Sequence, residues 1–364
     1  MKVLTVVGAR PQFIKAAPVS RALREAGHTE FLAHTGQHYD RQMSRVFFEE
    51  MQLPEPNVNL EVGSGSHGWQ TAQMLMSLET TMEQQRPDGV LVYGDTNSTI
   101  AAALAACKLQ LPIAHVEAGL RSFNRAMPEE HNRVLTDHCS DRLFCPTQTA
   151  VENLAREGIT KGVHLVGDTM LDAVLQFAAI ARERSRILHQ LGIEPQRYLL
   201  ATLHRPYNTD APENLRNILE AFAATNETVV FPVHPRTRRR IDELNETPSA
   251  SAANVKMIEP VGYLDMLALE QHARLILTDS GGMQKEAYFF NVPCVTLRPE
   301  TEWVETVEAG WNIIAGAARE QILRAVTEHA WPTTEPPRLF GDGHAAAKIV
   351  AHLASADAVG ERGV

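Results

Sequence analysis

With 364 residues, 44% of them hydrophobic and 21% charged, the chain has the composition of a globular protein long enough for two domains. Its net charge of -10 argues against a general binder of nucleic acid or of anionic membranes, because neutralising phosphates requires a basic face. Four cysteines without C-x-x-C spacing predict neither a disulfide framework nor a zinc site, and no apolar run is long enough to span a membrane, so we expect a cytoplasmic protein.

Short runs rich in Val, Ile and Leu alternate with stretches of helical periodicity along the chain, which predicts parallel βαβ units with helices on both sheet faces. The strands expected in the first half are Val3–Val7, Val90–Tyr93, Ile113–Val116, Leu143–Cys145 and Val163–Val166. Those expected in the second half are Tyr198–Thr202, Val229–Val233, Val255–Ile258, Leu275–Thr278, Val292–Thr296 and Asn312–Ala315. The helical segments include Thr96–Leu109, Glu213–Ala223 and Gly281–Phe290.

One long helix is predicted over Thr169–Leu191, closed by Gly192, and it separates the two sets of strands. We therefore predict two α/β domains, residues 1–168 and 169–342. The chain after Gly341 has a helical pattern to about residue 358, and we expect this helix, residues 343–358, to complete the first domain.

Charged or histidine-bearing loops follow seven of the predicted strands. In an open parallel sheet ligands bind beyond the carboxyl ends of the strands, so these loops predict a ligand site in a cleft between the two halves. The loops are 8–15, 94–96, 117–119, 202–205, 234–236, 279–282 and 298–302.

Two of these loops lead into helix starts that suit an anion. Arg10 and Lys15 flank the start of the first helix, and Ser280, Gly281 and Gly282 offer bare backbone N–H groups at the start of a later one. Plainer interpretations remain open at this point. Lys15 is equally compatible with a solvated lysine, and the glycines are compatible with tight strand–helix packing.

Two acidic residues also allow two interpretations. Glu286, one helical turn beyond Gly282, is suited to accept hydrogen bonds from a ribose diol, but it is also compatible with exposed helix surface. Asp95 is compatible with an ordinary helix N-cap.

Neither a nicotinamide cofactor nor a metal is expected. The segment Gly8-Ala9-Arg10 is not a G-x-G-x-x-G fingerprint, and none of the 15 histidines forms H-E-x-x-H or a comparable cluster.

Several motifs in a fixed order resemble those of non-hydrolysing UDP-N-acetylglucosamine 2-epimerases, and the resemblance extends over nearly the whole chain. The matching segments are Gly8–Lys15, Gly94–Thr96, His115–Arg121, Pro128–Arg133, His204–Arg205 and Thr278–Glu286.

The resemblance implies a GT-B fold of two Rossmann-like domains, a UDP-sugar substrate, no cofactor and a homodimer. It places Asp95, Glu117, Glu129 and His204 on the catalytic positions of the family. It assigns substrate binding to Arg10, Lys15, His234, Ser280, Gly281, Gly282 and Glu286. Arg121 and Arg133 are then expected to order and charge-balance the crowded carboxylates.

The chemistry of such enzymes explains the residue types. C2 of an N-acetyl sugar carries no hydroxyl, so the expected route is loss of the C2 proton together with departure of UDP from C1. Return of a proton to the other face of the resulting 2-acetamidoglucal inverts C2. Carboxylates would move the protons, and positive charge would stabilise the departing diphosphate.

Some segments favour a branch of the family that epimerises UDP-2,3-diacetamido-2,3-dideoxyglucuronate. They are Thr35–Asp40, Arg121–Asn124 and His234–Arg238. The chain also departs from the usual pattern at Tyr207, where many members have Glu, and at Trp303, where the N-acetylglucosamine enzymes often have Arg. The carboxylate of the uronate would be expected to bind a cationic side chain, for which Arg125, Arg205 and Arg236 are candidates. UDP-N-acetylglucosamine activates some members through a Gln-His segment, but different residues follow Gln37-His38 here, so this regulation is not expected.

Three functions from other classes remain open. A hydrolysing epimerase would release UDP, a GT-B glycosyltransferase would not need the three carboxylates together, and a nucleotide-sugar sensor would bind without turnover.

Overall fold

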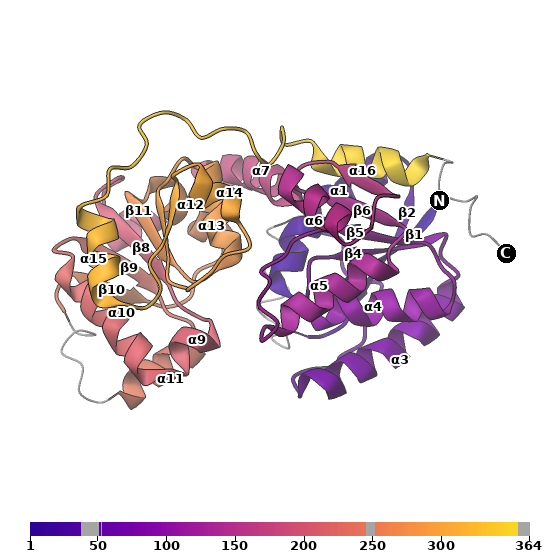
Figure 1. Ribbon diagram of the computed structural model, residues 1–364, viewed down its shortest axis with the longest axis horizontal. Helices are drawn as coiled ribbons and strands as arrows, with labels where there is room; N and C mark the ends of the chain where they lie inside the picture. The colour runs from indigo at the N-terminus through magenta and orange to yellow at the C-terminus, as the bar shows by residue number, and fades with distance from the viewer. Residues whose placement is uncertain (38–50, 52, 245–251, 356–364) are drawn as a thin grey trace. The chain divides into compact units, whose positions relative to one another are not determined.

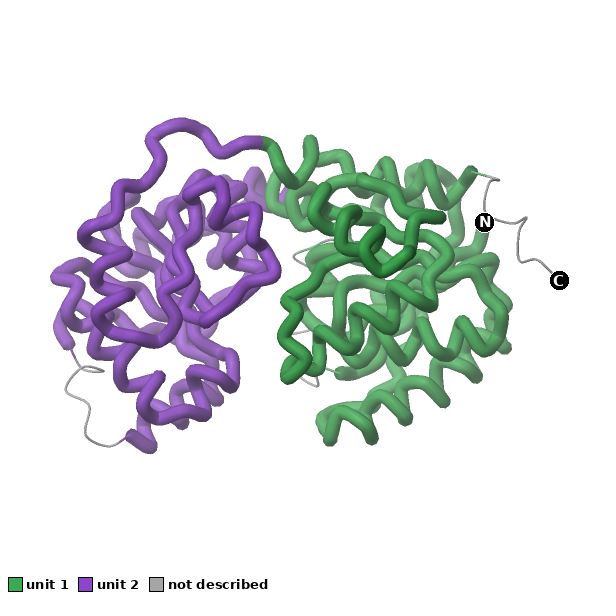
Figure 2. Tube along the Cα trace, in the orientation of Figure 1, with its two compact units in different colours: residues 1–175, 338–364 green, residues 176–337 purple. Residues whose placement is uncertain are grey.

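The computed structural model describes residues 1–37, 51, 53–244 and 252–355. The chain forms two compact units (Figure 2), of which unit 1 consists of Met1–Leu175 with the chain from Arg338 onward, and unit 2 of Gln176–Pro337. Each unit is built on one parallel sheet with helices packed against it (Figure 1). The prediction of an α/β fold with two parallel sheets is confirmed.

The sheet of unit 1 has seven strands in the order β3-β2-β1-β4-β5-β6-β7. Their bounds are β1 Lys2–Val7, β2 Thr29–His34, β3 Val58–Asn59, β4 Gly89–Tyr93, β5 Ile113–Val116, β6 Arg142–Cys145 and β7 Val163–Leu165. The helices that begin in this unit are α1 Arg10–Glu25, α3 His67–Gln85, α4 Asn97–Lys108, α5 Pro128–Cys139, α6 Gln148–Arg156, α7 Thr169–Arg184 and α16 Ala345–Ala354.

Small side chains let one helix of unit 1 lie close to the sheet. Ala101, Ala102, Ala105 and Ala106 of α4 are fully buried against alternate residues of the central strands, and methionine and leucine side chains of α3 join the same cluster. All five residues of β4 are buried, which is why this strand reads as a continuous apolar run.

The sheet of unit 2 has six strands in the order β10-β9-β8-β11-β12-β13. Their bounds are β8 Tyr198–Thr202, β9 Thr228–Pro232, β10 Val255–Ile258, β11 Leu275–Thr278, β12 Cys294–Thr296 and β13 Asn312–Ile314. The helices are α8 Ile187–Leu191, α9 Pro206–Thr209, α10 Pro212–Ala224, α11 Pro235–Glu243, α12 Tyr263–His272, α13 Gly281–Phe289, α14 Val304–Glu308 and α15 Arg319–Thr327.

Alternate residues of the central strand β8 belong to two separate hydrophobic cores. Leu199 and Ala201 pack with residues of α10 and α15, whereas Tyr198 and Leu200 pack with residues of α12 and α13. Successive strand residues point to opposite faces, so both faces of this sheet are apolar and both are covered.

Each sheet contains one point where the strand order reverses, and such a point is where open α/β sheets bind ligands. It lies between β1 and β4 in unit 1 and between β8 and β11 in unit 2. The loops that leave these four strands carry Arg10, Asp95, His204 and Ser280 respectively.

Three details of the prediction were wrong. Strands β2 and β3 were missed, because β2 is only half buried and β3 has two residues, so neither forms an apolar run. The helix expected over Thr169–Leu191 is two helices, α7 and α8, and Ser185 between them bonds Asp265 at 2.6 Å and accepts from the backbone N–H of Ile187 at 3.3 Å.

The last helix returns to the first unit. Helix α16 packs against α1, which lies at the other end of the sequence (Figure 1). Its backbone is tied to unit 1 because the carboxylate of Asp172 accepts hydrogen bonds from the N–H groups of Ala345 and Ala346, at 3.1 and 2.8 Å. The end of the predicted helix, beyond residue 355, lies outside the described residues.

Candidate active site

Glu117 follows β5 and forms a buried ion pair with Lys15 of α1. Its backbone has φ +70°, and its N–H and that of Ala118 both donate to the carbonyl of Phe144, at 3.1 Å each. This sharp turn directs the carboxylate toward the neighbouring strand end. Lys15 is therefore not a solvated lysine, because its ammonium group is already held by a carboxylate.

Gly94, which follows β4, lies against this ion pair. It has φ +60°, and a Cβ atom at this position would lie 3.1 Å from Glu117 Oε2 and 3.5 Å from Lys15 Nζ. The positive φ favours glycine, and a side chain here would crowd the carboxylate of Glu117.

Asp95 lies next to Gly94 and is held by a second cation. Arg133 Nη2 of α5 lies 2.6 Å from Asp95 Oδ2, and Asn132 Nδ2 donates to the Asp95 carbonyl at 3.0 Å. The Asp95 side chain is 30% exposed, so its carboxylate is ordered yet accessible. The N-cap of α4 is Thr96, whose side chain accepts from Thr99 N–H, so the interpretation of Asp95 as a helix cap is wrong.

The loops after β1 and β4 are joined by a residue that sequence reasoning missed. The buried amide of Gln12 accepts from the N–H groups of Gly8 and Ala9, at 2.8 and 3.1 Å, and donates to the Tyr93 carbonyl at 2.9 Å. Its only sequence signal was its place inside the first matching segment.

The first turn of α5 carries Glu129, which is half buried, and Glu130, which is buried. Glu130 was not predicted as a site residue. Its carboxylate accepts from Ser122 N, Ser122 Oγ and Phe123 N, each at 2.9 Å, and thereby shapes the loop between β5 and α5. Phe123 has φ +58° and is 71% exposed, so this loop presents an aromatic ring to solvent.

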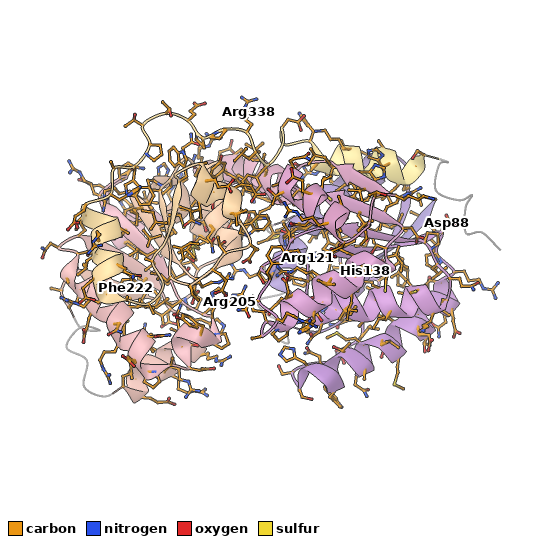
Figure 3. The ribbon with its side chains drawn as sticks, viewed as in Figure 1. Asp88, Arg121, His138, Arg205, Phe222 and Arg338 are labelled. Atoms are coloured by element: carbon orange, nitrogen blue, oxygen red, sulfur yellow. The ribbon has the colours of Figure 1, made fainter. Side chains whose placement is uncertain are left out.

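Arg121 does not balance the carboxylates of Glu117 and Glu129, as the sequence had suggested. Its guanidinium (labelled in Figure 3) pairs with Glu157 and Asp137, with N–O distances of 2.7 Å. Burial alone would raise the pKa of Asp137, but hydrogen bonds and charge from His115 and Arg121 lower it below its ordinary value. Arg133 does order carboxylates of this region, but they are Asp95, at 2.6 Å, and Glu130, at 3.2 Å.

In unit 2, His204 follows β8 and is aligned by Asp279, which follows β11. His204 Nδ1 lies 3.1 Å from Asp279 Oδ1, and the carboxylate also accepts from Arg205 N and Asn208 Nδ2 at 3.0 Å. Burial alone would raise the pKa of Asp279, but His204 and the other donors lower it. The His204 side chain is 46% exposed, which leaves its outer nitrogen accessible.

Helix α13 begins as predicted, with Ser280 as its N-cap and Gly281 as its first residue. A Cβ atom on Gly281 would lie 2.6 Å from Glu302 Oε1 and 3.3 Å from Trp303 Nε1, so the loop after β12 closely approaches this helix start. Glu302 pairs with Arg298 at 2.9 Å. The glycine therefore serves the close packing of this loop against the helix start.

Glu286 is buried in α13 and is not exposed helix surface. Tyr263 donates to Glu286 Oε1 at 3.0 Å, which orients the carboxylate. The neighbouring Lys285 lies over the ring of Trp303, with Nζ 4.0 Å from the ring centroid. The buried ring of Trp303 thus forms a cation–π contact with the ammonium group of Lys285.

The remaining predicted residues lie at helix starts. Arg10 is the first residue of α1, and His234 caps α11 by accepting from Arg236 N at 3.2 Å. Arg236 itself pairs with Asp210 at 2.6 Å, which competes with its suggested role as a uronate cation. Gln37 accepts from Ser98 Oγ at 2.6 Å, and His38 lies outside the described residues.

Neither a metal cluster nor a membrane-spanning helix is found among the residues that the structure describes. Across residues 1–37, 51, 53–244 and 252–355, no three His, Cys, Asp or Glu side chains are grouped as a metal would require. None of the helices that the structure describes has the length and apolarity needed to cross a membrane.

Comparison with known proteins gives consistent matches. Residues 21–354 match the family model described as UDP-N-acetylglucosamine 2-epimerase. The chain is 54% identical over 352 residues to a UDP-N-acetylglucosamine 2-epimerase homolog of Methanococcus maripaludis, covering 96% of this chain and 98% of that protein. It is 48% identical over 362 residues to the UDP-2,3-diacetamido-2,3-dideoxy-D-glucuronate 2-epimerase of Pseudomonas aeruginosa, covering 97% and 99%.

A solved structure agrees with the fold. The crystal structure of Methanocaldococcus jannaschii UDP-GlcNAc 2-epimerase in complex with UDP-GlcNAc and UDP superposes with a TM-score of 0.89 at 44% identity, covering 97% of this chain and 99% of that one. The predicted GT-B fold is confirmed.

Proposed function

The chain belongs to the UDP-N-acetylglucosamine 2-epimerase family, and we propose that it interconverts UDP-N-acetylglucosamine and UDP-N-acetylmannosamine without net hydrolysis. The observation that carries this proposal is the pair Asp95 and Glu117. They follow the neighbouring strands β4 and β5, of which β4 borders the switch point of unit 1, and each carboxylate is held by its own cation. Two ordered carboxylates are what a reaction with two proton transfers requires.

The proposed reaction has two half-steps that mirror each other. A carboxylate takes the C2 proton while the C1–O bonding electrons leave with UDP, and C1 and C2 become joined by a double bond. An acid then returns a proton to the opposite face of C2, and the UDP oxygen re-forms its bond to C1. The net change is inversion at C2, and no oxidant, reductant or water is consumed.

Unit 1 supplies the proton-transfer groups in this proposal. Asp95, Glu117 and Glu129 are the acids and bases, and Arg133 and Lys15 keep the first two ordered. Lys15 is also proposed to contact UDP. Since an ammonium group has three donors, it can do so while keeping Glu117.

Unit 2 supplies the binding of UDP and the stabilisation of the leaving group. The start of α13 at Ser280, Gly281 and Gly282 suits the diphosphate, because a helix start carries partial positive charge. The Ser280 N–H already donates to Thr278 Oγ1 at 3.0 Å, so the backbone donors in this proposal are those of the two glycines. Glu286, oriented by Tyr263, suits the ribose diol. His204, aligned by Asp279, is proposed to act on the departing phosphate oxygen, and Arg10 and His234 are proposed to add further contacts.

An isotope experiment tests the elimination. Product formed in D2O should carry deuterium at C2, and an 18O label in the C1–O–P bridge should scramble into the non-bridging β-phosphate oxygens. The assay is run with EDTA and without added NAD, where full activity is expected. An epimerised product with its original C2 hydrogen and no scrambling would contradict the mechanism. UDP accumulating with free N-acetylmannosamine would indicate a hydrolysing enzyme instead.

A second substrate is favoured by one observation. The chain is 48% identical to the Pseudomonas aeruginosa enzyme named for the diacetamido glucuronate. Arg125 is exposed in the loop that precedes α5, and Arg205 follows His204, so both remain candidates for a uronate carboxylate. Parallel NMR assays with the two UDP-sugars, compared by kcat/KM, decide between them.

The proposal also includes an oligomeric state and a cellular location. The family resemblance supports a homodimer, which sedimentation of the full chain would test, and a cytoplasmic location. A monomer that retains full turnover would remove the dimer from the proposal.

A further inference from the structure

His115 of β5 lies buried behind the carboxylates of unit 1, and both of its ring nitrogens are engaged. Nδ1 lies 2.7 Å from Asp137 Oδ1, and Nε2 lies 2.8 Å from the carbonyl oxygen of Gly94. The ring is 0% exposed, so water does not substitute for either partner. The proton positions on this ring therefore follow from what its two partners are able to do.

Neither partner is a donor. A backbone carbonyl oxygen has lone pairs and no proton, so a nitrogen 2.8 Å away must carry the hydrogen. The Asp137 carboxylate already accepts from Arg121 Nη1 at 2.7 Å and from Gly119 N at 3.1 Å, which is the environment of an ionised carboxylate. Its Oδ1 therefore accepts from Nδ1 as well.

We propose that His115 is an imidazolium, with a proton on both ring nitrogens, that positions the Gly94–Asp95 turn for catalysis through its donated bond to the Gly94 carbonyl. An imidazole with a proton on only one nitrogen would leave two lone pairs facing each other on one side of the ring. Its role as a positioning residue rests on the proposed function, whereas its charge state follows from the contacts alone.

The surrounding charges accommodate a buried cation. Asp137 lies between His115 and Arg121, and Glu157 pairs with the far side of Arg121. The four groups form a chain of alternating sign with no net charge. On the Gly94 side, Lys15 and Glu117 already neutralise each other. A buried charge is tolerated only when it is paired in this way.

The hydrogen bond from His115 to Gly94 matters because Gly94 contacts β5, His115 and the ion pair of Glu117 with Lys15. Its N–H donates to the Val116 carbonyl at 3.0 Å, its carbonyl accepts from His115, and its bare Cα faces the ion pair of Glu117. Asp95 is the next residue. A hydrogen bond from a charged donor is shorter and stronger than a neutral one, so it restrains this turn more tightly.

NMR of the full-length protein, labelled with 15N on histidine, tests the charge state without reference to activity. At neutral pH both ring nitrogens of His115 should show a directly bonded proton that exchanges slowly. The signals are assigned by their absence in a His115→Gln variant. In Asp137→Asn one nitrogen should lose its proton, because an amide can donate to it. A wild-type spectrum with one unprotonated ring nitrogen on His115 would overturn the proposal.

Two substitutions separate the bonds to the two partners. The shorter side chain of His115→Asn places an amide near the Nδ1 position, and the longer one of His115→Gln places it near the Nε2 position. We expect His115→Asn to lower kcat roughly tenfold to a hundredfold, as loss of a charged hydrogen bond does, and His115→Gln to lower it only a few-fold. UDP affinity should change little in either. His189→Asn, on the exposed surface of α8, is the control.

Hydrogen exchange of the Gly94 amide provides a second readout. It should be faster in His115→Asn than in His115→Gln, even where both variants have the same melting temperature. Equal kcat and equal exchange in the two variants would show that the ring only fills space. If the wild type turned over neither UDP-sugar, the proposed function would fail, while the NMR and exchange results would still decide whether His115 is charged and holds the turn.

Discussion

Units 1 and 2 each pair a histidine with a wholly buried aspartate near the carboxyl ends of the central strands, but the group that each pair leaves exposed is different. In unit 1, His115 is 0% exposed and lies behind the turn that presents Asp95. In unit 2, His204 is 46% exposed, and Asp279 lies behind it. In unit 1 the His115–Asp137 pair supports the turn that carries the Asp95 carboxylate, whereas in unit 2 the aspartate supports the exposed His204.

The difference follows from where the histidine stands along its strand. His115 lies within β5, so its ring is enclosed by the sheet and its helices. His204 lies beyond the end of β8, where the chain has left the sheet. A histidine inside the sheet is available only to protein groups, whereas one at the strand end can reach a ligand.

The two units also use different sources of charge. Unit 1 holds its carboxylates with the side chains of Lys15 and Arg133. Unit 2 offers the backbone start of α13 and a carboxylate oriented by a tyrosine hydroxyl. This contrast suggests that substitutions in unit 1 should affect turnover, and that substitutions at α13 should affect UDP binding.

The largest expected effect comes from removing one acid–base group in each unit. Asp95→Asn and His204→Asn should each lower kcat roughly a hundredfold or more, while UDP affinity changes far less, because Asp95 is proposed to transfer a proton and His204 to act on the departing phosphate oxygen. Steady-state kinetics and calorimetric titration with UDP measure the two quantities. Asp242→Asn, an exposed carboxylate of α11, is the control. Unchanged kcat in both variants would remove these residues from the chemistry.

A smaller effect is expected at the proposed ribose contact. Glu286→Ala should weaken UDP binding roughly tenfold, as loss of hydrogen bonds to a charged group does, with kcat within a few-fold of the wild type. Tyr263→Phe is the matched variant, because it removes only the hydroxyl that orients Glu286 and should weaken binding less. If Glu286→Ala and Asp95→Asn show the same kinetic defect, the division of labour between the units is wrong.

The smallest effect concerns acid stability. The pKa of Asp279 in the folded protein lies below its ordinary value of 3.8, although burial alone would raise it, because His204 and other donors favour the ionised form. The Asp279 carboxylate therefore binds a proton more readily in the unfolded chain than in the folded protein. The stability that Asp279 contributes is fully present above about pH 4 and is lost as the pH falls below it.

Asp279→Asn should accordingly lower the melting temperature near pH 7 by roughly 3 to 8 °C, and the variant should lose less of its stability between pH 5 and pH 3 than the wild type. Calorimetry at these pH values measures both. An identical pH slope in the two proteins would show that this carboxylate does not gain from being ionised in the folded state.

Much of the fold was predictable because the central strands are buried on both faces. β4, β8 and β11 are continuous apolar runs, and their bounds agree with the prediction to within a residue. β2 was not predictable in this way, since its first half is exposed or only partly buried. The break between α7 and α8 depends on the contact of Ser185 with Asp265, which is distant in sequence.

Local sequence was enough to place Asp95, Glu117, His204 and Ser280 at strand ends, because the step from apolar run to polar loop is visible without any structure. The partners of these residues could not be read in that way. Lys15 meets Glu117, Arg133 meets Asp95, and Asp279 meets His204 through strands or helices that are separated along the chain. Strand order and helix packing bring such residues together, and these depend on contacts across the whole unit.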